Sequence, residues 1–189
     1  MTTQHATLPA WSVHLGTTGS TCVRFACDVV RDGDPWPLSR VVADLSAGGA
    51  SLAERPRALG SGRGIPLVHS QRMVWRGTTL ELEAHHLRDG GHDEVSVTLP
   101  AWDELTTAVS EEDEVWEMID VVAAAIMPRF GIIGDGEAIE VSGADTGDWR
   151  RMLRRHTGLL THTYMTPPPS ILASLYRTLP RSCMIAFVR

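Results

Sequence analysis

Two segments of alternating apolar and polar residues, TLELEAHHL at 79–87 and DEVSVTLP at 93–100, constrain the fold of this chain more than any other feature. Alternation with a period of two is typical of a strand that buries one face. The sequence between them, RDGGHD, contains the glycine and aspartate residues that tight hairpin turns favour. The pattern therefore predicts an antiparallel hairpin whose inward-facing residues are Leu80, Leu82, Ala84, Val95, Val97 and Leu99.

A further strand is predicted by TCVRFACDVV at 21–30, where the same alternation recurs. Its inner side would carry Val23, Phe25, Cys27 and Val29, and Arg24 would face the other way. The preceding WSVHL is expected to pair with it through the turn TTGS.

The strongest helical pattern covers residues 111–127. Acidic residues fill its first turn, where the helix dipole favours negative charge. One apolar stripe at helical spacing follows, made of Val115, Met118, Ile119, Val122 and Ile126. Pro128 then ends the helix, because proline lacks the backbone donor that continuation needs.

Weaker patterns complete the chain. They predict short strands at 136–141, 159–165 and 182–188, a helix at 167–179, and a basic amphipathic turn or helix at 148–156. A short helix is also predicted from about Leu38, ended by Gly48 and Gly49. Residues 50–64 lack periodicity and are expected to form a surface loop. Because strands come in hairpins more than in alternation with helices, we expect an α+β fold. It would be a single domain spanning residues 1–189, with a mainly antiparallel sheet and helices packed on one face.

Composition narrows the possible functions. A net charge of -6 and a pI near 5.7 argue against a protein that binds nucleic acid through a basic face. No apolar run approaches the roughly 20 residues needed to cross a bilayer, so no membrane association is expected. The start of the chain lacks the pattern of a secretory signal. Cys22 and Cys27 would face opposite sides of one strand, which disfavours a disulfide and suggests a cytoplasmic location.

The glycine-rich segment MPRFGIIGDGEA at 127–138 invites comparison with a phosphate-binding loop. Such a loop follows a strand and opens a helix. Here the order is reversed, and Asp135 and Glu137 would repel a phosphate. We therefore interpret Gly131, Gly134 and Gly136 as the turn by which the helix leads into the next strand.

Catalytic and metal-binding signals are weak. Adjacent histidines on a strand, His85 and His86, point to opposite faces and cannot chelate one ion together without a bulge. His86 with His92 and Asp93 across the turn could form part of a metal site, but no HExxH, CxxC or His-x-His motif supports it. No cysteine lies in a setting typical of an activated thiolate, and Ser20 lacks the pattern of a nucleophile elbow. We expect no metal and no cofactor, and the weakness of these signals argues against an enzyme. A triad assembled in space from distant residues stays open.

Acidic residues gather before and within the first turns of the main helix. Charged surfaces of this kind speed encounter with a complementary protein and fix its register. The candidate partner-binding residues are Asp103, Glu104, Glu111, Glu112, Asp113, Glu114 and Glu117.

The second half of the chain resembles one of the immunity-protein families encoded beside polymorphic toxins. The similarity rests on DEVSVTLPAWDEL leading into an acidic helix, then VVAAAIMPRFGIIGDGE, then a strand-like segment. The matching positions are Val97, Leu99 and Pro100, then Phe130 and Gly131, then residues 158–164. The resemblance implies a small cytoplasmic protein without catalytic activity, which neutralises its partner by binding it.

Three hypotheses of function follow. The first is a protein-binding domain, an immunity protein that neutralises a cognate toxin. The second is a small-molecule enzyme or ligand-binding domain, with a pocket between sheet and helices lined by Arg24, His86, His162 and Tyr164. The third is a structural component of a phage or secretion assembly. The sequence leaves the oligomeric state open.

Overall fold

A computed structural model of the protein describes residues 21–27, 37–55, 57–59, 67–86, 93–99, 112–135, 158–162 and 176–188. The helices of these ranges are α1 (Pro37–Ala47) and α3 (Glu112–Ile126). The strands are β1 (Thr21–Cys27), β2 (Ser51–Leu52), β3 (Arg57–Leu59), β4 (Leu67–Trp75), β5 (Thr78–His86), β6 (Asp93–Leu99), β7 (Phe130–Asp135), β8 (Gly158–His162), β9 (Tyr176–Leu179) and β10 (Met184–Val188).

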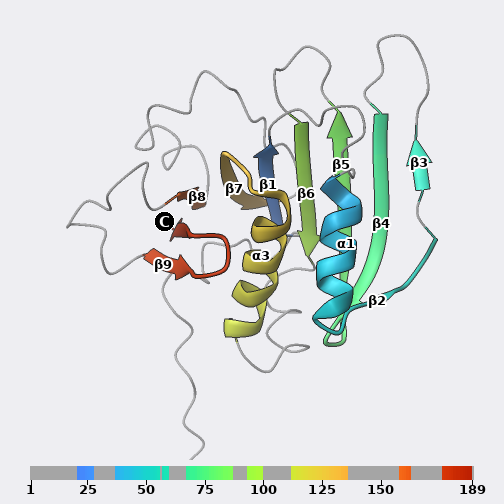
Figure 1. Ribbon diagram of the computed structural model, residues 1–189, viewed down its shortest axis with the longest axis horizontal. Helices are drawn as coiled ribbons and strands as arrows, with labels where there is room; N and C mark the ends of the chain where they lie inside the picture. The colour runs from blue at the N-terminus through green and yellow to red at the C-terminus, as the bar shows by residue number, and fades with distance from the viewer. Residues whose placement is uncertain are drawn as a thin grey trace, which may run out of the picture.

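The strands of the described ranges form one ten-stranded sheet in the order β2-β4-β5-β6-β1-β7-β8-β10-β9, with β3 also paired to β4. Every pairing is antiparallel. Figure 1 shows α1 and α3 side by side in front of this sheet. The helices contact each other, α1 also contacts β5, and α3 contacts β1 and β9. The predicted α+β class, with an antiparallel sheet and helices on one face, is confirmed.

The predicted central hairpin is present as β5 and β6. Leu82 pairs with Val97 and Ala84 with Val95, so the inward-facing residues of both strands meet on one face. All six predicted inward residues are buried in the main core. The turn sequence between the two strands lies mostly outside the described residues.

Strand β1 lies in the middle of the sheet, between β6 and β7. Its predicted alternation is confirmed, because Val23, Phe25 and Cys27 are buried in the core that the helices cover. Cys22 belongs to a second buried cluster, as expected for a residue on the opposite face of the strand. The WSVHL segment expected to pair with β1 lies outside the described residues.

Helix α1 ends as its glycines predict. The amide of Ala50 donates to the carbonyl of Leu45 and that of Gly49 to the carbonyl of Ser46, at 2.9 and 3.0 Å. These two bonds form the Schellman motif, which requires a left-handed residue after the helix. Gly49 supplies that residue with φ of 99°.

Helix α3 contains the whole predicted apolar stripe, and each of its members is buried. The stripe is wider than one face, because Trp116, Val121, Ala123 and Ala125 are buried as well. Helix α3 therefore has neighbours around most of its circumference.

The interpretation of the glycine-rich segment was wrong in its detail. The chain leaves α3 through Met127, which has φ of 47°, and Gly131 and Gly134 lie within strand β7. A Cβ atom on Gly131 would be 2.9 Å from a ring carbon of Phe25 and 3.0 Å from a methyl carbon of Leu160. Gly131 is therefore required for close packing, and not for a turn. Gly136 lies outside the described residues.

Three further segments differ from expectation. The predicted surface loop at 50–64 contains β2 and β3, which both pair with β4. Strand β4 itself is not predicted. The end of the predicted helix at 167–179 is strand β9, which pairs with β10. Pairing with a neighbouring strand overrides a local helical preference when the partner supplies the backbone hydrogen bonds. The strands expected at 159–165 and 182–188 are present in part as β8 and β10.

Candidate functional site: a charged cluster at the sheet edge

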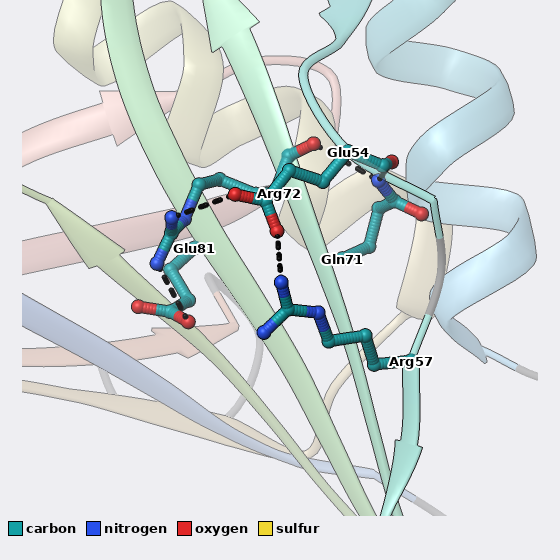
Figure 2. Close-up of polar contacts among 5 residues, drawn as sticks. All are labelled: Glu54, Arg57, Gln71, Arg72 and Glu81. Carbon is teal, nitrogen blue, oxygen red and sulfur yellow. Dashed lines mark hydrogen bonds and ion pairs between the residues drawn. The ribbon is translucent and has the colours of Figure 1, made fainter.

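A group of charged and polar residues lies where β2, β3, β4 and β5 meet at one edge of the sheet. We call it the edge cluster, and its members are Glu54, Arg55, Arg57, Ser70, Arg72 and Glu81. On β4, Gln71 and Met73 are buried, so Ser70 and Arg72 face away from the helices, since successive side chains point to opposite faces. Figure 2 shows most of the cluster.

The carboxylate of Glu54 joins two arginines. Its Oε2 is 2.7 Å from Nη2 of Arg57 and its Oε1 is 3.0 Å from Nη1 of Arg72. The guanidinium of Arg72 extends the chain of charges, because its Nη2 is 3.6 Å from Oε1 of Glu81. Arg72 and Glu81 are also direct cross-strand partners, a position at which opposite charges stabilise a sheet. Figure 2 shows Glu54 between the two guanidinium groups.

A buried amide fixes the backbone that carries Glu54. Gln71, which is 2% exposed, donates from Nε2 to the carbonyl oxygens of Glu54 and Arg72 at 2.7 and 2.9 Å. The amide of Ala53 donates to the carbonyl of Arg72 at 3.0 Å. The connection between β2 and β3 is thus attached to β4 at two points, and the Glu54 side chain starts from a defined position.

The cluster encloses a shallow hollow. Its free volume is about 20 Å³, which is enough for about one water molecule. Three arginines and two glutamates line it, so its formal charge is +1. Among the residues that the structure describes, Arg55 has no hydrogen-bond or ion-pair partner for its side chain. The hollow can therefore accept a charged group but cannot enclose a substrate.

The acidic residues predicted to bind a partner lie on a different surface. Asp103, Glu104 and Glu111, and the side chain of Glu112, fall outside what the structure describes. Asp113, Glu114 and Glu117 are on the first turns of α3. The prediction that these acids contact a partner is not tested by their position.

All three described acids are paired with arginines of the same chain. Arg76, in the turn between β4 and β5, lies 3.1 Å from Glu114 Oε1 and 2.9 Å from Glu117 Oε2. Glu117 Oε1 is 3.3 Å from Nη2 of Arg181. Asp113 pairs with Arg177. The start of α3 is therefore a surface of mixed charge and not a purely acidic one.

Two of these arginines also lie over tryptophan rings. The guanidinium carbon of Arg76 is 5.0 Å from the ring centre of Trp75, and that of Arg177 is 5.9 Å from the ring centre of Trp116. Stacking of a cation on an indole face is favourable at these separations. It also restricts the arginine side chains, so their charges are held in place.

The four residues of the alternative ligand pocket are not brought together where the structure describes them. Arg24 pairs with Glu94 at 3.6 Å. His162 is 2.7 Å from the carbonyl oxygen of Pro128 through Nε2. By the register of β1, β7 and β8, Arg24 and His162 occupy opposite faces of the sheet. His86 ends β5, which three strands separate from β8, and Tyr164 is outside the described residues.

A further polar pair lies on the face of the sheet away from the helices. His85 Nε2 is 3.4 Å from Glu83 Oε2, and this hydrogen bond is the main reason that the pKa of Glu83 lies below its ordinary value. On the same face, burial raises the pKa of the Cys22 thiol. A thiol with a raised pKa is a poor nucleophile near neutral pH.

Sequence reasoning missed the edge cluster. A signal was present in the run Glu54, Arg55 and Arg57, where charges accumulate just before a strand. The other members could not be added because β4 was not recognised. Without the register of β4 and β5, nothing places Arg72 beside Glu81.

Within the described ranges, no group of three or more histidine, cysteine, aspartate or glutamate residues is arranged to hold a metal ion. The helices described here are too short or too polar to cross a bilayer.

Comparison with known proteins gives little. No protein-family model matches the sequence, and no curated protein matches it. Among solved structures, the chain is similar to the Pseudomonas aeruginosa T6SS protein PA0821, with a TM-score of 0.43 and 8% sequence identity. The similarity covers 90% of this chain and 66% of that one, so this chain spans just under two thirds of its length. At this TM-score the likeness supports no argument about function.

Proposed function

We propose that this protein is a non-catalytic domain that binds another protein through charged surfaces. The observation that carries the proposal is the edge cluster, in which two carboxylates hold arginines around a hollow of about 20 Å³. A hollow of this size suits one charged group of a larger partner better than a whole substrate.

Preorganisation makes such a surface effective. Ordering a long side chain on binding costs about 0.5–1.5 kcal/mol. Glu54 already holds Arg57 and Arg72, and stacking on tryptophan restricts Arg76 and Arg177. Part of the ordering cost is therefore met before a partner arrives. Arginine is also among the residues that contribute most at protein interfaces.

The finer proposal is that the partner is a toxin and that this chain is its immunity protein. It rests on the sequence resemblance of the second half of the chain to a polymorphic-toxin immunity family. We propose that the contact surface includes the acidic start of α3, with Asp113, Glu114 and Glu117. On binding, these three acids would leave their ion pairs with arginines of the same chain and form ion pairs with the partner.

The test is affinity capture of the intact protein from an extract of its native host, at low and at high salt. We expect one protein to be recovered in stoichiometric amount and to be released at high salt, because exposed charge pairs are screened. Expression of that protein alone should arrest growth, and co-expression of this chain should restore it. Recovery of a bound metabolite without a protein would contradict the proposal and favour a ligand-binding domain.

A further inference from the structure

We propose that the edge cluster is a binding site for a carboxylate-bearing segment of the protein partner, with Arg55 and Arg57 as the receiving groups. This inference rests on the proposed function, since it names the chemistry of the partner at one site.

The donor groups of the three arginines are used unequally. An arginine offers five N–H donors. Arg72 contacts Glu54 through Nη1 and Glu81 through Nη2, so both ends of its guanidinium are engaged. Arg57 contacts Glu54 through Nη2. In the described part of the chain, no ion pair or hydrogen bond engages the guanidinium of Arg55. Unused donors therefore lie on the Arg55 and Arg57 side of the hollow.

These donors are accessible. The side chain of Arg57 is 67% exposed, and Arg55 is also exposed. Ser70 lines the same hollow and adds a hydroxyl group. The connection that carries Arg55 is attached to β4 by the Gln71 bond to the carbonyl of Glu54 and by the bond from the Ala53 amide to the carbonyl of Arg72. An incoming group would meet donors whose backbone is already positioned.

Charge selects a carboxylate over a phosphate. The hollow has a formal charge of +1, which one carboxylate neutralises. A phosphate monoester, as in a phosphorylated side chain, carries about -1.5 to -2 near neutral pH and would meet Glu54 and Glu81 at close range. A carboxylate also matches the planar fork of a guanidinium, with two parallel hydrogen bonds. An acidic segment of a protein provides such groups in succession.

The chain offers a matched control. Arg40 is exposed on α1, which covers the other face of the sheet. No side-chain partner for it is present among the described residues. Arg40→Glu and Arg55→Glu change the net charge equally, so a difference between them reports on position.

The experiment measures fluorescence anisotropy of a labelled hexaglutamate peptide titrated with the full chain in about 20 mM salt, where screening is weak. We expect saturable binding by the unaltered protein and by Arg40→Glu. Arg55→Glu should bind about fivefold more weakly, as the loss of one exposed charge contact implies. Arg55→Lys should bind more tightly than Arg55→Glu but more weakly than the unaltered protein, because it keeps the charge and loses the planar fork that a carboxylate matches.

Three results would overturn the inference. They are equal binding by Arg55→Glu and Arg40→Glu, no binding of hexaglutamate, and tighter binding of a six-residue oligothymidylate than of the peptide. If Arg55→Glu and Arg40→Glu bound equally, the remaining explanation of the edge cluster would be that its charges prevent strand pairing at the sheet edge. Affinity capture from the host extract distinguishes an error in the binding site from failure of the proposed function. If unaltered protein and Arg55→Glu capture the same partner equally, only the site is wrong; if neither captures one, the proposed function itself fails.

Discussion

Replacing Asp120 with alanine should destabilise the protein more than any other single change of an acidic residue among those described. Asp120 is on α3 and is 3% exposed. Its Oδ2 accepts the amide of Arg181 at 2.9 Å, and its Oδ1 accepts the amide and the hydroxyl of Ser182 at 2.9 and 2.6 Å. The carboxylate thereby fixes the turn between β9 and β10 against the helix.

The size of the effect follows from those bonds. Hydrogen bonds to a charged group contribute about 1.5–3 kcal/mol each, and they are not additive within one group. We expect Asp120→Ala to lower the free energy of unfolding by about 3 kcal/mol, which corresponds to a fall in Tm of about 6–12 °C for a chain of this length. Ser182→Ala removes one of the three donors and should cost about 1.5 kcal/mol, the lower end of this range.

Urea unfolding followed by tryptophan fluorescence measures both effects. Asp44→Ala is the control, because Asp44 is exposed on α1 and surface changes of this kind stay within about 0.5 kcal/mol. If Asp120→Ala lost no more stability than Asp44→Ala, the reasoning about the turn would be refuted.

Three more predictions concern stability and reactivity. Gly131→Ala should cost about 1–3 kcal/mol in the same unfolding assay, because the added methyl group would crowd Phe25; an unchanged midpoint would contradict the packing argument. Since the pKa of Glu83 is lowered mainly by His85, the pair contributes stability above the unfolded pKa of about 4.5, and that contribution is lost as the pH falls through the lower folded pKa. His85→Ala should therefore flatten the acid dependence of stability, and an unaltered slope would argue against the pair. With a thiol reagent, one cysteine, Cys183, should react quickly in the folded protein because the other two are buried, whereas three fast thiols would show that the two buried positions open.

Period-two patterns predicted the strands at the centre of the sheet well, because the two faces of each of these strands differ clearly from each other in polarity. From Leu80 to Ala84 on β5 and from Val95 to Leu99 on β6, the residues buried toward the helices are all apolar, so the alternation is visible in the sequence. Strand β4 points His69 and Gln71 to the same face as Met73 and Trp75. Polar residues at inward positions obscured the alternation, so β4 was missed, and β2 and β3, which pair with it, were missed as well.

The charge patterns of the sequence identified the acidic residues of α3 but not the residues that pair with them. Helix α3 was predicted with its acids, but their arginine partners Arg76, Arg177 and Arg181 come from β-turns and from a strand far along the chain. The pairing follows from the order of the strands, which local periodicity does not determine. For the same reason, the edge cluster depends on a register between β4 and β5 that could not be predicted from composition.

The central claim, that charged surfaces of this protein bind a protein partner, is tested most directly by the association rate constant measured with the captured partner across ionic strength. Between about 20 and 300 mM salt, we predict that the rate constant falls at least tenfold, and that Arg55→Glu has a slower association and a shallower dependence on salt than Arg40→Glu. A rate constant that does not change with salt, and that both variants share with the unaltered protein, would contradict the account.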